Sequence, residues 1–79
     1  MDFQDASEKI DEIVETIDDN IDDIPDAGVD YFENTKEFLT SVQQTIANTL
    51  RVTTKQRDAI LNCESGIQKW IDNLRRRRR

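Results

Sequence analysis

The sequence predicts an all-α protein, a small antiparallel three-helix bundle. Three segments, about residues 5–24, 30–51 and 54–74, repeat apolar residues at alternating intervals of three and four, the spacing of one helix face. Each segment opens with two polar residues three apart that suit a helix capping box. No stretch alternates with period two for long enough to predict a strand. Short connections between helices of about 20 residues favour neighbours that run antiparallel.

The first predicted helix is acidic on every side except one. Asp5 and Glu8 have the spacing of a capping box, which satisfies free backbone N–H groups at a helix start. Its apolar seam consists of Ile10, Val14, Ile17, Ile21 and Ile24, widened by Ile13. Pro25 cannot continue the helix, and residues 26–28 are expected to form a turn.

The second predicted helix begins with the same capping spacing, at Asp30 and Glu33. Its apolar stripe consists of Phe32, Thr35, Leu39, Val42 and Ile46, widened by Phe38 and Leu50. The pattern breaks at residues 52–54, where we expect the connection to the third helix.

The third predicted helix opens with Thr53 and Gln56 as its capping box. Its stripe consists of Ile60, Cys63, Ile67, Trp70 or Ile71, and Leu74. Gly66 stands in mid-helix, where glycine costs about 1 kcal/mol relative to alanine. We therefore expect a neighbouring helix to approach closely at this position.

The net charge of −6 conceals two halves of opposite sign. Residues 1–40 hold 14 acidic residues and two lysines, giving −12, and residues 41–79 hold three acidic and nine basic residues, giving +6. Five of those nine basic residues form the terminal run 75–79. We interpret the chain as one helical domain, residues 1–74, followed by a polyarginine tail, residues 75–79.

The residue content argues against an enzyme. The chain has no histidine and a single cysteine, Cys63, so it lacks the commonest general base and the usual zinc ligand sets. Acidic residues 18–23 invite comparison with a calcium loop, but an EF-hand needs glycine at position six and glutamate at position twelve, where this chain has Asp23 and Val29. We expect no catalytic residue, metal or cofactor.

The sequence also indicates a cellular compartment for the protein. A lone thiol suits a reducing compartment. No apolar run approaches the length needed to span a bilayer, and the N-terminus is acidic where a signal peptide would be basic and then apolar. We expect a soluble cytoplasmic protein that does not bind membranes.

Basic residues of the second half are candidates for nucleic-acid binding, because guanidinium and ammonium groups contact phosphates and displace condensed counterions. They are Lys55, Arg57, Lys69, Arg75, Arg76, Arg77, Arg78 and Arg79. The arginine run is equally explained as a solvated tail. Trp70 could stack a base if its ring is exposed, although its place on the apolar stripe favours burial.

Three other interpretations stay open. The acidic face of the first helix could imitate a phosphate backbone and occupy a nucleic-acid-binding protein, through Asp11, Glu12, Glu15, Asp18, Asp19, Asp22 and Asp23. The Ile10–Ile24 seam could pair with a second copy. Because the first and third helices of such a bundle run parallel, the arginine tail could also fold back on the acidic end of the first helix until nucleic acid competes for it.

A resemblance to a known family covers residues 38–70. The residues that carry it are Phe38-Leu39-x-Ser41-Val42, Val52-Thr53-x-Lys55-Gln56-x-x-Ala59-Ile60 and Gly66-Ile67-x-Lys69-Trp70. This pattern resembles a helical hairpin of small phage-encoded DNA-metabolism proteins, in particular the small companions of the T4-type phage UvsW recombination helicase. The resemblance implies a role in phage DNA recombination, repair and replication, in the cytoplasm of a bacterial host, beside a DNA helicase. The chain has no Gly-rich phosphate loop of the kind that ATP hydrolysis requires.

Overall fold

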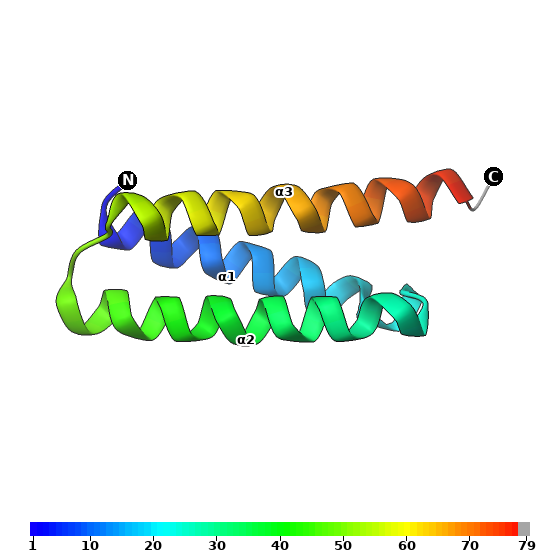
Figure 1. Cartoon of the computed structure of the whole chain (residues 1–79), viewed down its shortest axis with the longest axis horizontal. Coiled ribbons are helices and arrows are strands. Elements are labelled where there is room, and N and C mark those ends of the chain that lie inside the picture. Colours follow the sequence, from blue (N-terminus) through cyan, green and yellow to red (C-terminus); the bar gives the residue numbers. More distant parts are fainter. Residues whose placement is uncertain (78–79) are drawn as a thin grey trace.

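Three long helices pack side by side into a rod about 44 Å long and 17 Å across. The computed structural model describes residues 1–77. Its elements are α1 (Phe3–Asn20), a short 3-10 turn η1 (Ile21–Asp23), α2 (Asp26–Thr49) and α3 (Thr54–Arg77). The chain runs up, down and up, so α1 and α3 are parallel and both end at the pole opposite the α2–α3 connection (Figure 1). The predicted all-α three-helix bundle is confirmed.

Helix α1 begins earlier than the sequence pattern predicted. Asp2 is its N-cap, and the Asp2 carboxylate accepts a hydrogen bond from the backbone N–H of Asp5 at 2.8 Å. The predicted capping box of Asp5 and Glu8 is therefore wrong, because Asp2 offers an equivalent acceptor one turn before them. The α-helix ends at Asn20, and residues 21–23 tighten into η1.

Helix α2 begins directly after Pro25, so the predicted turn at residues 26–28 is wrong. Pro25 is the N-cap, and its carbonyl accepts a hydrogen bond from the N–H of Gly28 at 2.7 Å. Proline is tolerated at this place because a helix start has no hydrogen-bond partner for its missing N–H. Asp30 then lies inside the helix rather than at its cap.

The start of α3 confirms the predicted capping box of Thr53 and Gln56. The N–H of Thr53 donates to the Gln56 Oε1 at 2.9 Å, and the N–H of Gln56 donates to the Thr53 Oγ1 at 3.1 Å. The helix continues past Leu74 to Arg77. Arginine is a good helix former, and positive charge is favourable at a helix C-terminus, so the first three residues of the expected tail extend α3.

A single apolar core lies between the three helices. Its largest fully buried side chains are Phe32, Ile10, Ile17, Leu39, Ile46 and Ile60. The first-helix seam lies within this core, with Val14 and Ile21 packed against it, so it is not available to pair with a second copy. Phe38 and Leu50, predicted to widen the second stripe, are instead exposed by 46% and 60%. In the described part of the chain, no helix is both long and apolar enough to cross a membrane.

Candidate nucleic-acid interface

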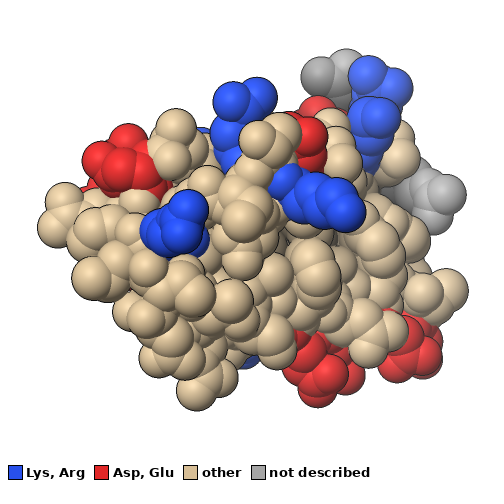
Figure 2. Space-filling model, turned by 60° about the vertical axis from the view of Figure 1, so that its left-hand side comes forward, with Lys and Arg blue, Asp and Glu red and all other residues tan. Residues whose placement is uncertain are grey.

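Charge is segregated around the bundle. Helix α1 carries seven acidic residues and one lysine, whereas α3 carries three acidic and six basic residues. Figure 2 shows Lys and Arg side chains over the upper part of the molecule, with some Asp and Glu side chains near them and others along the lower edge. A broad uncharged surface lies below the basic side chains. Positive charge is therefore concentrated on α3, although acidic residues lie near part of it.

The predicted phosphate-binding residues fall on two sides of α3. Lys55, Lys69 and Arg76 are separated by multiples of seven residues, so they lie in one line along the outer surface of the helix. At 1.5 Å per residue this line is about 30 Å long. Arg57 and Arg75 are eighteen residues apart, which is five full turns, so they lie on the same flank of α3. This flank is nearer to α1, because it also carries Glu64, which contacts Lys9 of α1. The structure thus supports one row of three cations, with Asp58 in the same line, rather than a single cluster of all the predicted residues.

The cations of this row are accessible. Lys55, Lys69 and Arg76 are exposed, and no ion pair among the described residues involves them. Arg57 contacts the neighbouring Asp58 at 3.7 Å, a weak pair between exposed side chains. Arg75 is also exposed. Arg78 and Arg79, together with the side chain of Arg77, lie outside the described residues.

Trp70 is half-buried, as its place on the apolar stripe predicted. Its ring stacks on that of Tyr31 at 6.4 Å between centroids and 27° between planes, and it meets Phe32 edge-on at 6.1 Å. A Cβ at Gly28 would lie only 3.0 Å from two carbons of the indole ring, so this glycine makes room for Trp70. The tryptophan therefore belongs mainly to the bundle, and Tyr31 covers it.

Gly66 was expected to allow close approach of a neighbouring helix, and the structure shows a side chain of α2, that of Tyr31, over this position. A Cβ at Gly66 would collide with the hydroxyl oxygen of Tyr31, which lies over α3 at this point. Tyr31 keeps 39% of its surface exposed even so. The sequence pattern did not single out Tyr31, since it lies beside the α2 stripe rather than on it. A glycine in mid-α3 was the signal that a large residue crosses from α2.

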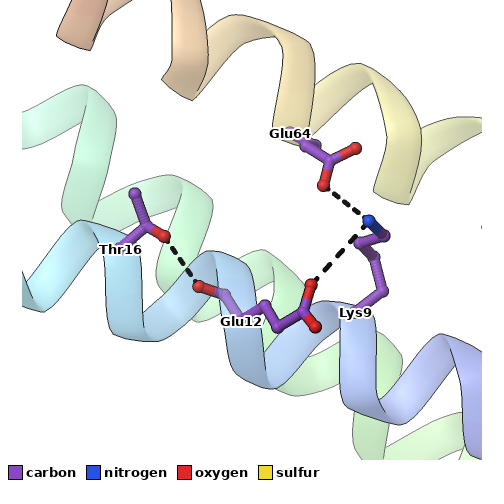
Figure 3. Close-up of polar contacts among 4 residues, drawn as sticks. All are labelled: Lys9, Glu12, Thr16 and Glu64. Carbon is purple, nitrogen blue, oxygen red and sulfur yellow. Dashed lines mark hydrogen bonds and ion pairs between the residues drawn. The ribbon is translucent and has the colours of Figure 1, made fainter.

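The predicted acidic surface of α1 is present, but three of its members are engaged within the bundle. Asp11 accepts a hydrogen bond from the Gln43 Nε2 at 2.8 Å, and Asp18 pairs with Lys36 of α2 at 2.7 Å. Glu12 lies 3.8 Å from Lys9, as Figure 3 shows. All seven predicted residues are exposed, and among the described residues Glu15, Asp19 and Asp22 make no ion pair.

Lys9 links α1 to α3. Its Nζ lies 2.9 Å from the Oε2 of Glu64, and Figure 3 shows the lysine reaching from α1 to that glutamate on α3. The hydrogen bond to Glu64 and the charge of that carboxylate raise the pKa of Lys9 above its ordinary value. Thr16 donates to the backbone carbonyl of Glu12 at 2.9 Å on the same side of α1. Of these contacts, the Lys9–Glu64 pair joins the acidic helix to the basic one, whereas the Thr16 hydrogen bond lies within α1.

Within the described part of the chain, no group of three or more acidic, cysteine or histidine residues is arranged to hold a metal ion. Cys63 is a half-buried free thiol, and burial raises its pKa, which disfavours the reactive thiolate.

No protein-family model, curated protein or solved structure matches the sequence.

Proposed function

We propose that this protein is a non-enzymatic accessory factor of DNA metabolism that binds single-stranded or branched DNA through the outer surface of α3. The row of Lys55, Lys69 and Arg76 carries the proposal, because these three cations are exposed and free of ion pairs among the described residues. Phosphates that bind there would release counterions, so the interaction is salt-dependent and weak at physiological ionic strength.

The biological setting of the proposal rests on the resemblance of residues 38–70. That segment contains the α2–α3 hairpin, with the Thr53–Gln56 cap at its turn. The resemblance supports a role in phage recombination, repair and replication beside a DNA helicase. Such a factor contributes DNA contacts or a docking surface, while its partner hydrolyses ATP.

A charge-neutralisation experiment tests the proposal. In Lys55→Gln/Lys69→Gln/Arg76→Gln the row is removed, and we expect the affinity for a labelled single-stranded oligonucleotide at low salt to fall at least tenfold. The control is Lys9→Gln/Lys36→Gln, which removes two positive charges rather than three, at residues that pair with Glu64 and Asp18. An equal loss in both variants would indicate a general effect of net charge and would overturn the proposal.

A second function is favoured by the exposed carboxylates of Glu15, Asp19 and Asp22. Their surface on α1 and η1 could occupy the basic cleft of a nucleic-acid-binding enzyme as an imitation of DNA. This alternative predicts that the chain itself does not bind DNA. It also predicts that the protein displaces DNA from such an enzyme, and that Glu15→Gln/Asp19→Asn/Asp22→Asn does so much less well than the unaltered chain.

A further inference from the structure

Two exposed aromatic side chains lie beside the cationic row, and the function proposed above leaves them unexplained. Tyr31 is 39% exposed and Phe38 is 46% exposed. They are seven residues apart on α2, so they lie on the same side of that helix, about 10 Å apart along its axis. A phenylalanine left exposed does not contribute the free energy that burial of its ring would add to stability.

Contacts of Tyr31 fix the register between this aromatic pair and α3. The Tyr31 hydroxyl lies over Gly66, and the Tyr31 ring stacks on Trp70, so Tyr31 is level with the part of α3 that bears Lys69. Helices α2 and α3 run antiparallel (Figure 1). Since Phe38 is seven residues after Tyr31, it lies farther toward the start of α3, between the levels of Lys69 and Lys55. The aromatic pair and the cations therefore form two parallel lines on neighbouring helices.

Most positions of the surface between these lines are uncharged. Those of α2 are Asn34, Ser41 and Thr45, with Asp30 one turn before Asn34, and those of α3 are Asn62, Gly66 and Asn73. Glu33 lies on the opposite side of α2 from Tyr31, whereas Glu37 lies beside Ser41. Figure 2 shows acidic side chains along the lower edge of the molecule and also near the basic side chains of its upper part. Asp58 of α3 is exposed and lies in line with the cations, eighteen residues before Arg76, so a strand following the row would pass this carboxylate, which lies 3.7 Å from Arg57.

We propose that the α2–α3 surface is a binding track for single-stranded DNA, in which bases stack on Tyr31 and Phe38 while the phosphates follow Lys55, Lys69 and Arg76. This inference rests on the proposed DNA-binding function and adds the groups that contact the bases. Stacking on aromatic rings and electrostatic tracking of the backbone are the two components of sequence-tolerant single-strand binding. A duplex keeps its bases paired inside, so it can use the cations but not the rings.

The test compares two strands with two aromatic variants. One labelled strand is an oligothymidylate, and the other is an abasic strand of the same length that has the phosphates but no bases. We expect Tyr31→Leu and Phe38→Leu each to weaken binding of the oligothymidylate about fivefold or more, the lower end of what stacking of one base contributes. Neither substitution should change binding of the abasic strand.

Phe3→Leu is the matched control, because Phe3 is exposed by 36% but lies at the start of α1, away from the track. Its affinity for both strands should equal that of the unaltered chain. Phe38 has no ring partner among the described residues, so Phe38→Leu tests stacking even if Tyr31→Leu disturbs Trp70.

The outcomes distinguish failure of the stacking track from failure of the DNA-binding function on which it rests. If the unaltered protein binds neither strand, the proposed function fails and the track fails with it. If it binds both strands equally and the aromatic variants change nothing, DNA binding stands and the stacking track is overturned. A loss of affinity for the abasic strand in Phe38→Leu would likewise contradict stacking, since that strand has no base to lose.

Discussion

Leu50 adopts a left-handed backbone conformation, which is unfavourable for a residue that has a Cβ atom. It is the only residue other than glycine in the described part of the chain with positive φ, at φ 55° and ψ 30°. Its N–H donates to the carbonyl of Ile46 at 2.7 Å, so the left-handed conformation ends α2 with a hydrogen bond. Glycine is the usual residue at such a position because it has no Cβ to clash.

Comparison of Leu50→Gly with Leu50→Ala isolates that cost. Both variants lose the leucine side chain, but only the alanine variant keeps a Cβ in the left-handed region, which costs roughly 1–2 kcal/mol. We expect Leu50→Gly to have the larger free energy of unfolding, by about 1 kcal/mol, in urea denaturation. If Leu50→Ala were as stable as Leu50→Gly, the backbone strain assigned to this position would be wrong.

Cys63 provides a pH-dependent prediction at the same scale. Burial raises its thiol pKa, so at pH 8 the native protein holds less thiolate than the unfolded chain. Alkylation by iodoacetamide should therefore be slower in the native protein than in denaturant, with a rate that rises at higher pH than for the unfolded thiol. Because the unfolded chain loses this proton first as pH rises, the same thiol makes folding less favourable above its ordinary pKa. Equal alkylation rates in both states would contradict the burial argument.

At the scale of the helix, the Thr53–Gln56 cap fixes where α3 begins and hence where the α2–α3 hairpin turns. Thr53→Ala removes the acceptor of the Gln56 N–H, and caps of this kind contribute about 1 kcal/mol. Thr54→Ala is the control, because Thr54 is the next residue and is also exposed. Thermal unfolding followed by circular dichroism should show the larger loss in Thr53→Ala, and equal losses would dismiss the cap as a determinant of stability.

Sequence periodicity predicted the helices better than their ends. The apolar intervals of three and four identified all three helices because burial of one face dominates their stability. Two of three capping boxes were wrong, since acidic residues are so frequent in residues 1–40 that several pairs have the right spacing. Asp2, one turn before Asp5, caps α1 instead.

The residues of the candidate site were likewise predicted only in part from the sequence. The cations of α3 could be identified from charge alone, but their separation onto two flanks needed the helix bounds, and the extension of α3 to Arg77 was not expected. Tyr31 could not be identified, because its exposure depends on how α2 lies against Gly66 and Trp70. Phe38 was assigned to the core, since spacing alone does not show how wide a face the neighbouring helices cover.

Across the whole molecule, the parallel course of α1 and α3 brings the acidic end of α1 and the basic end of α3 to one pole (Figure 1). We expect the carboxylates at this pole to oppose DNA binding, because they repel phosphates and attract the arginines that would otherwise contact DNA. Asp19→Asn/Asp22→Asn should therefore raise the affinity for single-stranded DNA severalfold at low salt. Asp5→Asn/Glu8→Gln makes the same change in net charge at the start of α1, at the opposite pole, and should have a smaller effect. Equal effects in an anisotropy titration would reduce the result to net charge.

The most direct test of the account is the salt dependence of single-strand binding. The logarithm of the affinity falls with the logarithm of salt concentration, with a slope of about −0.7 for each phosphate contacted on a single strand. Three contacts from Lys55, Lys69 and Arg76 predict a slope of about −2 or steeper, and neutralising all three should make it shallower by about 2. The account is contradicted if the protein does not bind single-stranded DNA at low salt, or if the slope is the same with and without these three charges.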